Sequence, residues 1–110
     1  MNLSDKHQTN DKMIVTLDPD FEDLIPAYLQ RRQADLEAIR QALAQNDFEK
    51  IHFLGHDMKG TGGGYGLDGL TEIGKVLEEA AKQENAGEIQ RSVETLADYL
   101  ARLVVRYAED

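Results

Sequence analysis

The sequence contains no cysteine and no tryptophan, and only two of its 110 residues are proline. Without cysteine the chain forms no disulfide framework and no thiolate zinc site, and it has no cysteine nucleophile, which fits a reducing cytoplasm. Basic residues are also scarce: 12 Lys and Arg face 21 Asp and Glu, a formal charge of −9. Because this charge repels phosphate backbones and anionic lipid, we expect neither nucleic acid nor a membrane surface as a partner.

Long apolar runs are missing as well. The first apolar stretch, Met13 to Val15 with Leu17 just beyond, is too short for a signal-peptide core or a membrane span. The length suits one domain, and the many acidic side chains favour solvated faces that keep a domain soluble and monomeric. We therefore expect one small, acidic, monomeric domain in the cytoplasm.

The first part of the chain predicts little regular structure. Residues 1–12 carry too few apolar groups to offset the entropy of ordering, so we expect a flexible leader. Residues 13–17 are rich in β-branched side chains but have no visible partner strand, which favours an extended flap over a sheet. Asp18 and Pro19 then offer an N-cap and the first residue of a short helix. Pro26 should end that helix or start the next one.

Four amphipathic segments follow, with apolar residues at steps of three and four, the spacing of a helix that buries one face. They are Pro26–Leu43, Phe48–Gly62, Leu70–Ala80 and Ile89–Tyr107. Asp47 is the predicted N-cap of the second, and no stretch alternates with period two for long enough to be a strand. The sequence therefore predicts an all-α fold: over residues 13–110, an antiparallel up-and-down four-helix bundle with a short N-terminal helix and a flexible leader.

Five glycines crowd into the seven residues from Gly60 to Gly66. In the middle of a helix each would cost about 1 kcal/mol relative to alanine, so either the helix ends here or something approaches its backbone closely. Two phosphate-loop patterns, GxGxxG from Gly64 and GxxxxGK from Gly69, can be fitted to this region. Neither has the preceding strand that such a loop requires, and Val76 replaces the Ser or Thr of the second. We interpret both as coincidences.

A second face of the 48–62 segment carries chemistry. Its members follow one another at steps of one to four and line one side of the helix: His52, His56, Lys59, Gly60 and Gly63. An imidazole beside an ammonium and a bare backbone can bind an anion and admit a docking surface. A histidine of ordinary pKa near 6.5 is largely neutral at pH 7, so its free nitrogen can act as a nucleophile. Lys59 can offset charge on a transferred phosphoryl group.

This stretch resembles the signature of histidine-containing phosphotransfer (HPt) domains. That signature is a His, a Lys three residues on, a Gly four on, small residues after it and a Gly ten on. In this chain those positions are His56, Lys59, Gly60 and Gly66. Downstream, Leu70, Ile73 and Leu77-Glu78 also follow the register of the family, and the resemblance covers roughly residues 18–107.

The resemblance implies a phosphoryl carrier rather than an enzyme. His56 would accept a phosphoryl group from a receiver-domain aspartyl phosphate and pass it to an aspartate of another receiver, while Lys59 would help to hold the phosphoryl oxygens. The docking surface would include His52, Gly55, Gly60 and Gly63. The partners would be receiver domains of response regulators or hybrid histidine kinases. They would bring the Mg²⁺ ion, and this chain would bind no cofactor or metal.

Asp57 departs from the family pattern. A His followed by an acidic residue is similar to the phosphorylated motif of histidine-kinase dimerisation helices, where the acid serves as a base. That motif continues with Thr or Asn and then Pro, whereas this chain has Gly60 and Thr61. The chain also has no room for an ATP-binding domain, which argues against a kinase.

Two other functions stay open. One is a helical interaction bundle without chemistry, which would leave the five glycines unexplained. The other is a metal-binding bundle, because Glu49-x-x-His52 is similar to the ligand pair of di-iron bundles and the pair His52/His56 could chelate zinc. Both metal sites need further ligands, and the only other histidine is His7.

Overall fold

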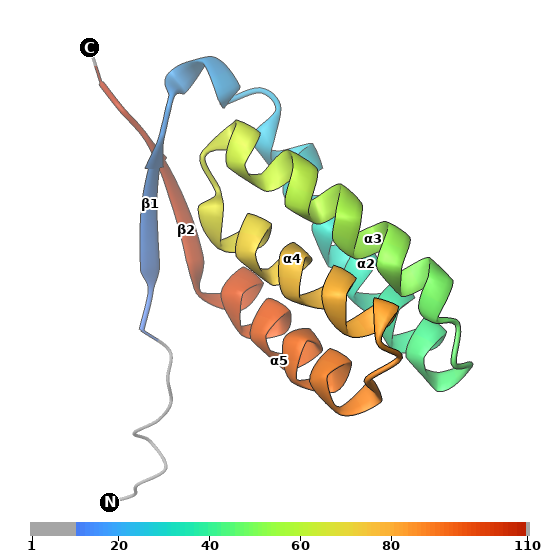
Figure 1. Cartoon of the computed structure of the whole chain (residues 1–110). Helices are drawn as coiled ribbons and strands as arrows, with labels where there is room; N and C mark the ends of the chain where they lie inside the picture. The colour runs from blue at the N-terminus through green and yellow to red at the C-terminus, as the bar shows by residue number, and fades with distance from the viewer. Residues whose placement is uncertain (1–10, 110) are drawn as a thin grey trace, which may run out of the picture.

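A computed structural model of the chain describes residues 11–109. The elements are, in order, β1 (Met13–Leu17), a 3₁₀ turn (Pro19–Phe21), α2 (Ile25–Ala44), α3 (Phe48–Gly62), a second 3₁₀ turn (Gly63–Tyr65), α4 (Asp68–Lys82), α5 (Ala86–Arg102) and β2 (Leu103–Tyr107). The four helices pack side by side, and the strand pair lies at one end of the bundle (Figure 1). This confirms a mainly helical fold of four helices. The predicted leader lies outside the described residues, except for Asp11 and Lys12.

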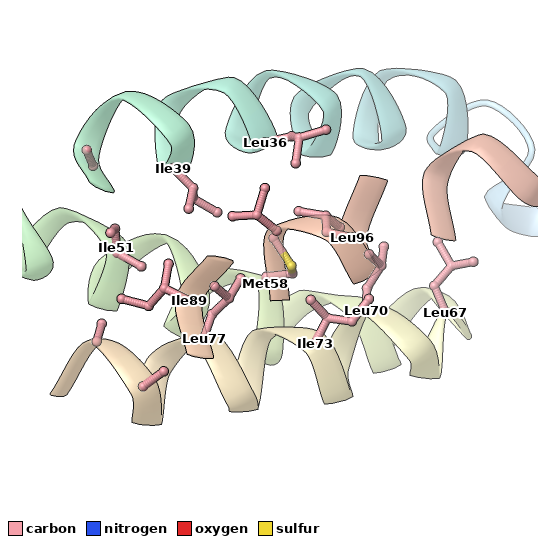
Figure 2. Close-up of a cluster of buried hydrophobic side chains, with 14 of the residues drawn as sticks. Leu36, Ile39, Ile51, Met58, Leu67, Leu70, Ile73, Leu77, Ile89 and Leu96 are labelled. Carbon is pink, nitrogen blue, oxygen red and sulfur yellow. The ribbon is translucent and has the colours of Figure 1, made fainter. Parts of the chain in front are cut away.

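The hydrophobic core lies between the four helices, as Figure 2 shows. Every helix contributes side chains that are essentially inaccessible to solvent, among them Ile39, Ile51, Met58, Leu70, Leu77, Ile89 and Leu96. Burial of one such side chain stabilises the fold by about 1.5–3 kcal/mol, so the apolar stripe of each helix decides which side faces inward. None of the described helices is apolar over a length that could cross a bilayer.

The predicted helix starts have local causes. The Asp47 carboxylate accepts the backbone N–H of Lys50 at 3.2 Å and so caps α3, as predicted. Asp18 likewise accepts the N–H of Asp20 at 2.8 Å, ahead of the first 3₁₀ turn. This single turn occupies the place of the predicted short N-terminal helix. Pro26 lies in the first turn of α2, where a missing N–H costs nothing.

Two predictions about the ends of the domain are wrong. The apolar spacing predicts that the last helix runs through Tyr107, and the lack of a visible partner strand predicts an extended flap at residues 13–17. Instead β1 and β2 form a parallel two-stranded sheet, with Met13 opposite Leu103 and Leu17 opposite Tyr107. A step of four from Leu103 to Tyr107 keeps both on one face of a helix and also on one face of a strand. The spacing therefore could not separate the two, and the β-branched pair Val104-Val105 favours the strand.

Glycines let α3 and α4 pack with their backbones in contact. A Cβ added to Gly55 would lie 2.8 Å from the backbone nitrogen of Glu78, and one added to Gly62 would lie 2.9 Å from that of Thr71. A Cβ on Gly74 would overlap the backbone of Lys59 on α3. No side chain fits between these backbones, so glycine is required at each position. The close approach places α4 side chains within reach of the polar face of α3.

Candidate functional site

Three basic side chains of α3 converge on one carboxylate of α4, that of Glu78. His56 Nδ1 lies 2.8 Å from Glu78 Oε2, and Lys59 Nζ lies 2.7 Å from Oε1. His52 Nε2 is more distant, 3.7 Å from Oε2. The structure thus brings together the predicted residues His52, His56 and Lys59, and it adds Glu78, which sequence reasoning placed only in the family register. The contact crosses between helices, so no spacing within α3 could reveal it.

The charges of this cluster keep Glu78 ionised and orient the ring of His56. Hydrogen bonds from Lys59 and then from His56 lower the pKa of Glu78 to about 2, so this carboxylate is ionised at neutral pH. An ionised carboxylate only accepts hydrogen bonds, so Nδ1 of His56 carries a proton in this contact. The side chain of His56 is 65% exposed while that of Glu78 is 17% exposed. The site therefore offers an exposed imidazole that its hydrogen bond to Glu78 orients.

The imidazole lies within an exposed strip of α3 and the turn that follows. The strip consists of Phe53, His56, Gly60 and Gly64. Phe53 is 68% exposed, an unusual place for a large apolar ring. A Cβ added to Gly60 or Gly64 would meet no atom within 4 Å, so the backbone beyond His56 is open. Sequence reasoning missed Phe53, although its step of three before His56 was a usable signal.

The predicted docking glycines divide between two roles. Gly60 and Gly63 are exposed, although a Cβ on Gly63 would point toward α4, 3.3 Å from Thr71 Oγ1. Gly55 is buried against α4 and cannot touch a partner, so its assignment to the docking surface is wrong. The physical reason is that Gly55 also belongs to the apolar stripe of α3, where it packs against the backbone of α4.

An ion network around the buried Arg32 lies on the α2 side of His56. Arg32 is 2% exposed, and its Nη2 lies 3.2 Å from Asp57 Oδ2 and 3.0 Å from Asp35 Oδ2. Its Nη1 donates to Thr61 Oγ1 at 3.2 Å, and the guanidinium lies 4.7 Å from the ring centroid of Tyr28. Burial raises the pKa of Asp35. Sequence reasoning missed this network because a charged residue does not count toward an apolar stripe.

The arrangement does not favour a metal site. Within residues 11–109, no group of three or more His, Cys, Asp or Glu side chains is placed so that it could hold a metal ion. The two histidines of α3 meet a carboxylate that is also bound to Lys59. His7 lies outside the described residues.

Comparison with known families agrees with this geometry. A family model described as the Hpt domain matches residues 23–105, which is most of the chain. The chain belongs to the Hpt domain family. It therefore has a phosphotransfer role in two-component signalling, as a phosphoryl carrier that interacts with receiver domains. The matched range includes all four helices, α2 to α5. β1 and the first 3₁₀ turn precede it and lie outside it. Neither the curated proteins nor the solved structures gave a match.

Proposed function

We propose that His56 is the phosphoryl-accepting residue of this Hpt domain. It takes the phosphoryl group from an aspartyl phosphate on one receiver domain and passes it to an aspartate of another. The observation that supports the proposal is the hydrogen bond from Nδ1 of His56 to Glu78, at 2.8 Å, on an imidazole that is otherwise exposed. It leaves Nε2 as the nucleophile.

The transfer can be written in two balanced steps. In the first, the lone pair of Nε2 attacks phosphorus, an N–P bond forms, and the P–O bond to the aspartyl group breaks with its electron pair on the departing carboxylate. The ring then carries a positive charge, which Glu78 stabilises through the Nδ1–H hydrogen bond. In the second, a carboxylate of the next receiver attacks phosphorus, the N–P bond breaks, and His56 returns to neutral imidazole.

Lys59 supports the same steps. Its ammonium contacts Glu78, and the Lys59 side chain is 39% exposed and one helical turn from His56. Because this side chain is flexible, a small rotation brings the ammonium to the phosphoryl oxygens. Lys59 then offsets phosphoryl charge, and Glu78 keeps the hydrogen bond to His56. The receiver domain holds the Mg²⁺ ion in this proposal. The carrier itself contributes orientation and a fixed proton position.

The exposed strip of Phe53, His56, Gly60 and Gly64 is the proposed contact surface for receivers. Exposed aromatic side chains are frequent anchors of protein interfaces, and Phe53 is one turn from the reacting ring. The open backbone at Gly60 and Gly64 lets the partner come close to Nε2. His52, 43% exposed, lies at the edge of this surface.

The test is phosphoryl transfer from a receiver domain carrying ³²P-labelled aspartyl phosphate, with Mg²⁺ present. The wild-type chain should acquire an acid-labile, base-stable label, and His56→Gln should acquire none while its far-UV circular dichroism stays unchanged. His52→Gln is the matched control, because it removes an imidazole from the same face one turn away, and it should retain the label. Label on the His56→Gln variant would refute the assignment.

A further inference from the structure

Asp57 poses a problem for the proposed chemistry. A carboxylate beside the phosphoacceptor should repel an incoming phosphoryl group, because both are negative. It should also raise the pKa of the neighbouring imidazole and so reduce the fraction that is nucleophilic at neutral pH. A phosphoryl carrier with a free acid in this position would work poorly.

The structure shows where this negative charge is held. The Asp57 carboxylate faces Arg32 of α2, with Oδ2 and Nη2 3.2 Å apart, while His56 is bound to Glu78 of α4. Thr61 fixes the same turn, since its hydroxyl donates to the Asp57 carbonyl at 2.9 Å and accepts from Arg32. A guanidinium keeps its proton in proteins, so Asp57 has a permanent cationic partner, which it shares with Asp35, 3.0 Å from the same Nη2.

Stability alone does not account for an arginine at this position. Arg32 is buried between the apolar positions of Tyr28 and Leu36 on α2, and its Nε has no hydrogen-bond partner among residues 11–109. A buried arginine loses its hydration, so it often contributes less to stability than an apolar residue of similar volume, even with an ion-pair partner such as Asp57, which is 41% exposed. Something other than packing therefore favours the charge.

We infer that Arg32 is a positioning residue for the phosphotransfer site. It holds the Asp57 carboxylate on the α2 side of α3 and offsets its charge, so that Asp57 repels the phosphoryl group less and does not bind the imidazole. The two acids beside His56 are thus divided between two helices: Glu78 orients the ring, and Asp57 is bound to Arg32. This inference rests on the proposed function of His56 but concerns a residue that the transfer chemistry does not touch.

The experiment uses potassium phosphoramidate as the phosphoryl donor, so that no receiver contact enters the measurement. The P–N bond of phosphoramidate breaks, ammonia leaves, and the Nε2–P bond of His56 forms. The rate of phosphohistidine formation is followed by ³¹P NMR for the wild type, Arg32→Gln, Asp57→Asn and the double variant. We expect Arg32→Gln to be about 3- to 10-fold slower, because the freed charge acts on both donor and ring. Asp57→Asn alone and the double variant should both stay within about twofold of the wild type.

The recovery in the double variant separates charge from packing. If Arg32→Gln and the double variant are equally slow, Arg32 acts through packing and the inference is wrong. Arg32→Gln at the wild-type rate would also overturn it. If Arg32→Gln does not fold, Asp57→Asn decides by itself: a severalfold faster rate means that the charge of Asp57 was never offset, and a severalfold slower rate means that Asp57 takes part in the chemistry. Either result refutes the inference.

A second readout remains valid if the proposed function fails. An NMR titration of His56 reports the charge around its ring, which comes from His52, Asp57 and Lys59 on α3, Glu78 on α4, and Arg32 and Asp35 on α2. Freed Asp57 should raise the pKa of His56 in Arg32→Gln, and Asp57→Asn should reverse that rise. A chain that takes no phosphoryl group but shows this pattern would contradict only the proposed function. A chain that is phosphorylated but shows no pKa change would contradict only the inference.

Discussion

Substitution of Gly74 by alanine should separate α3 from α4, whereas the same substitution at Gly60 should stabilise the protein. The added methyl group at Gly74 would overlap the backbone of Lys59 and lie 2.6 Å from the carbonyl oxygen of Gly55. Both obstacles are main-chain atoms, so no rotamer change can relieve the overlap. At Gly60 the new Cβ meets no atom within 4 Å, and alanine is the better helix former.

The magnitudes follow from these contacts. Overpacking typically costs about 1–3 kcal/mol and occasionally more, and rigid backbone obstacles place Gly74→Ala at the upper end, about 3 kcal/mol. With about 4–8 °C per kcal/mol for a domain of this size, its Tm should fall by roughly 12–24 °C. Gly60→Ala should gain about 0.5–1 kcal/mol, a rise of a few degrees.

The assay is thermal and urea unfolding followed by circular dichroism, with both variants measured beside the wild type. Each change adds one methyl group to a helix, so the two variants control for one another. A neutral Gly74→Ala, or a Gly60→Ala that is the less stable of the two, would show that α3 and α4 do not meet through their backbones. Because that approach carries Glu78 to His56, Gly74→Ala should also slow phosphoryl uptake.

Two further predictions concern Glu78 and β1. The folded pKa of Glu78, about 2, lies below its ordinary value of 4.5, so its stabilising contribution is complete above pH 4.5 and disappears as the pH falls toward 2. The urea midpoints of the wild type and Glu78→Gln should therefore differ at pH 7 and converge between pH 4.5 and pH 2; a constant difference would contradict this. Leu17 on β1 is only 4% exposed, so Leu17→Ala should lower the free energy of unfolding by about 2–5 kcal/mol. Ile14→Ala, on the outer face of the same strand, should cost below about 1 kcal/mol in the same urea titration, and equal losses would show that β1 is not docked as described.

The local part of the fold could be predicted because its causes lie within a few residues. Asp47 caps α3 through a residue three positions away, and the apolar stripes of α4 and α5 repeat every three or four residues. His56, Lys59 and Gly60 also lie within five residues, so the sequence alone placed them on one helix. This spacing is the basis for predicting His56 as the phosphoacceptor. That assignment stays a prediction until the label is placed on His56.

The contacts between distant residues had no such signal. Glu78 is 22 residues from His56, and Arg32 is 25 residues from Asp57, so neither pairing follows from a helical repeat. The pairing of β1 with β2 joins the two ends of the domain. Residues 103–107 form a strand there, although their apolar spacing fitted the predicted helix equally well. Residue types and short spacings fixed the helices and the reactive face. Packing of backbones at Gly55 and Gly74 decided which acid orients the imidazole, because only the folded chain brings α3 and α4 into contact.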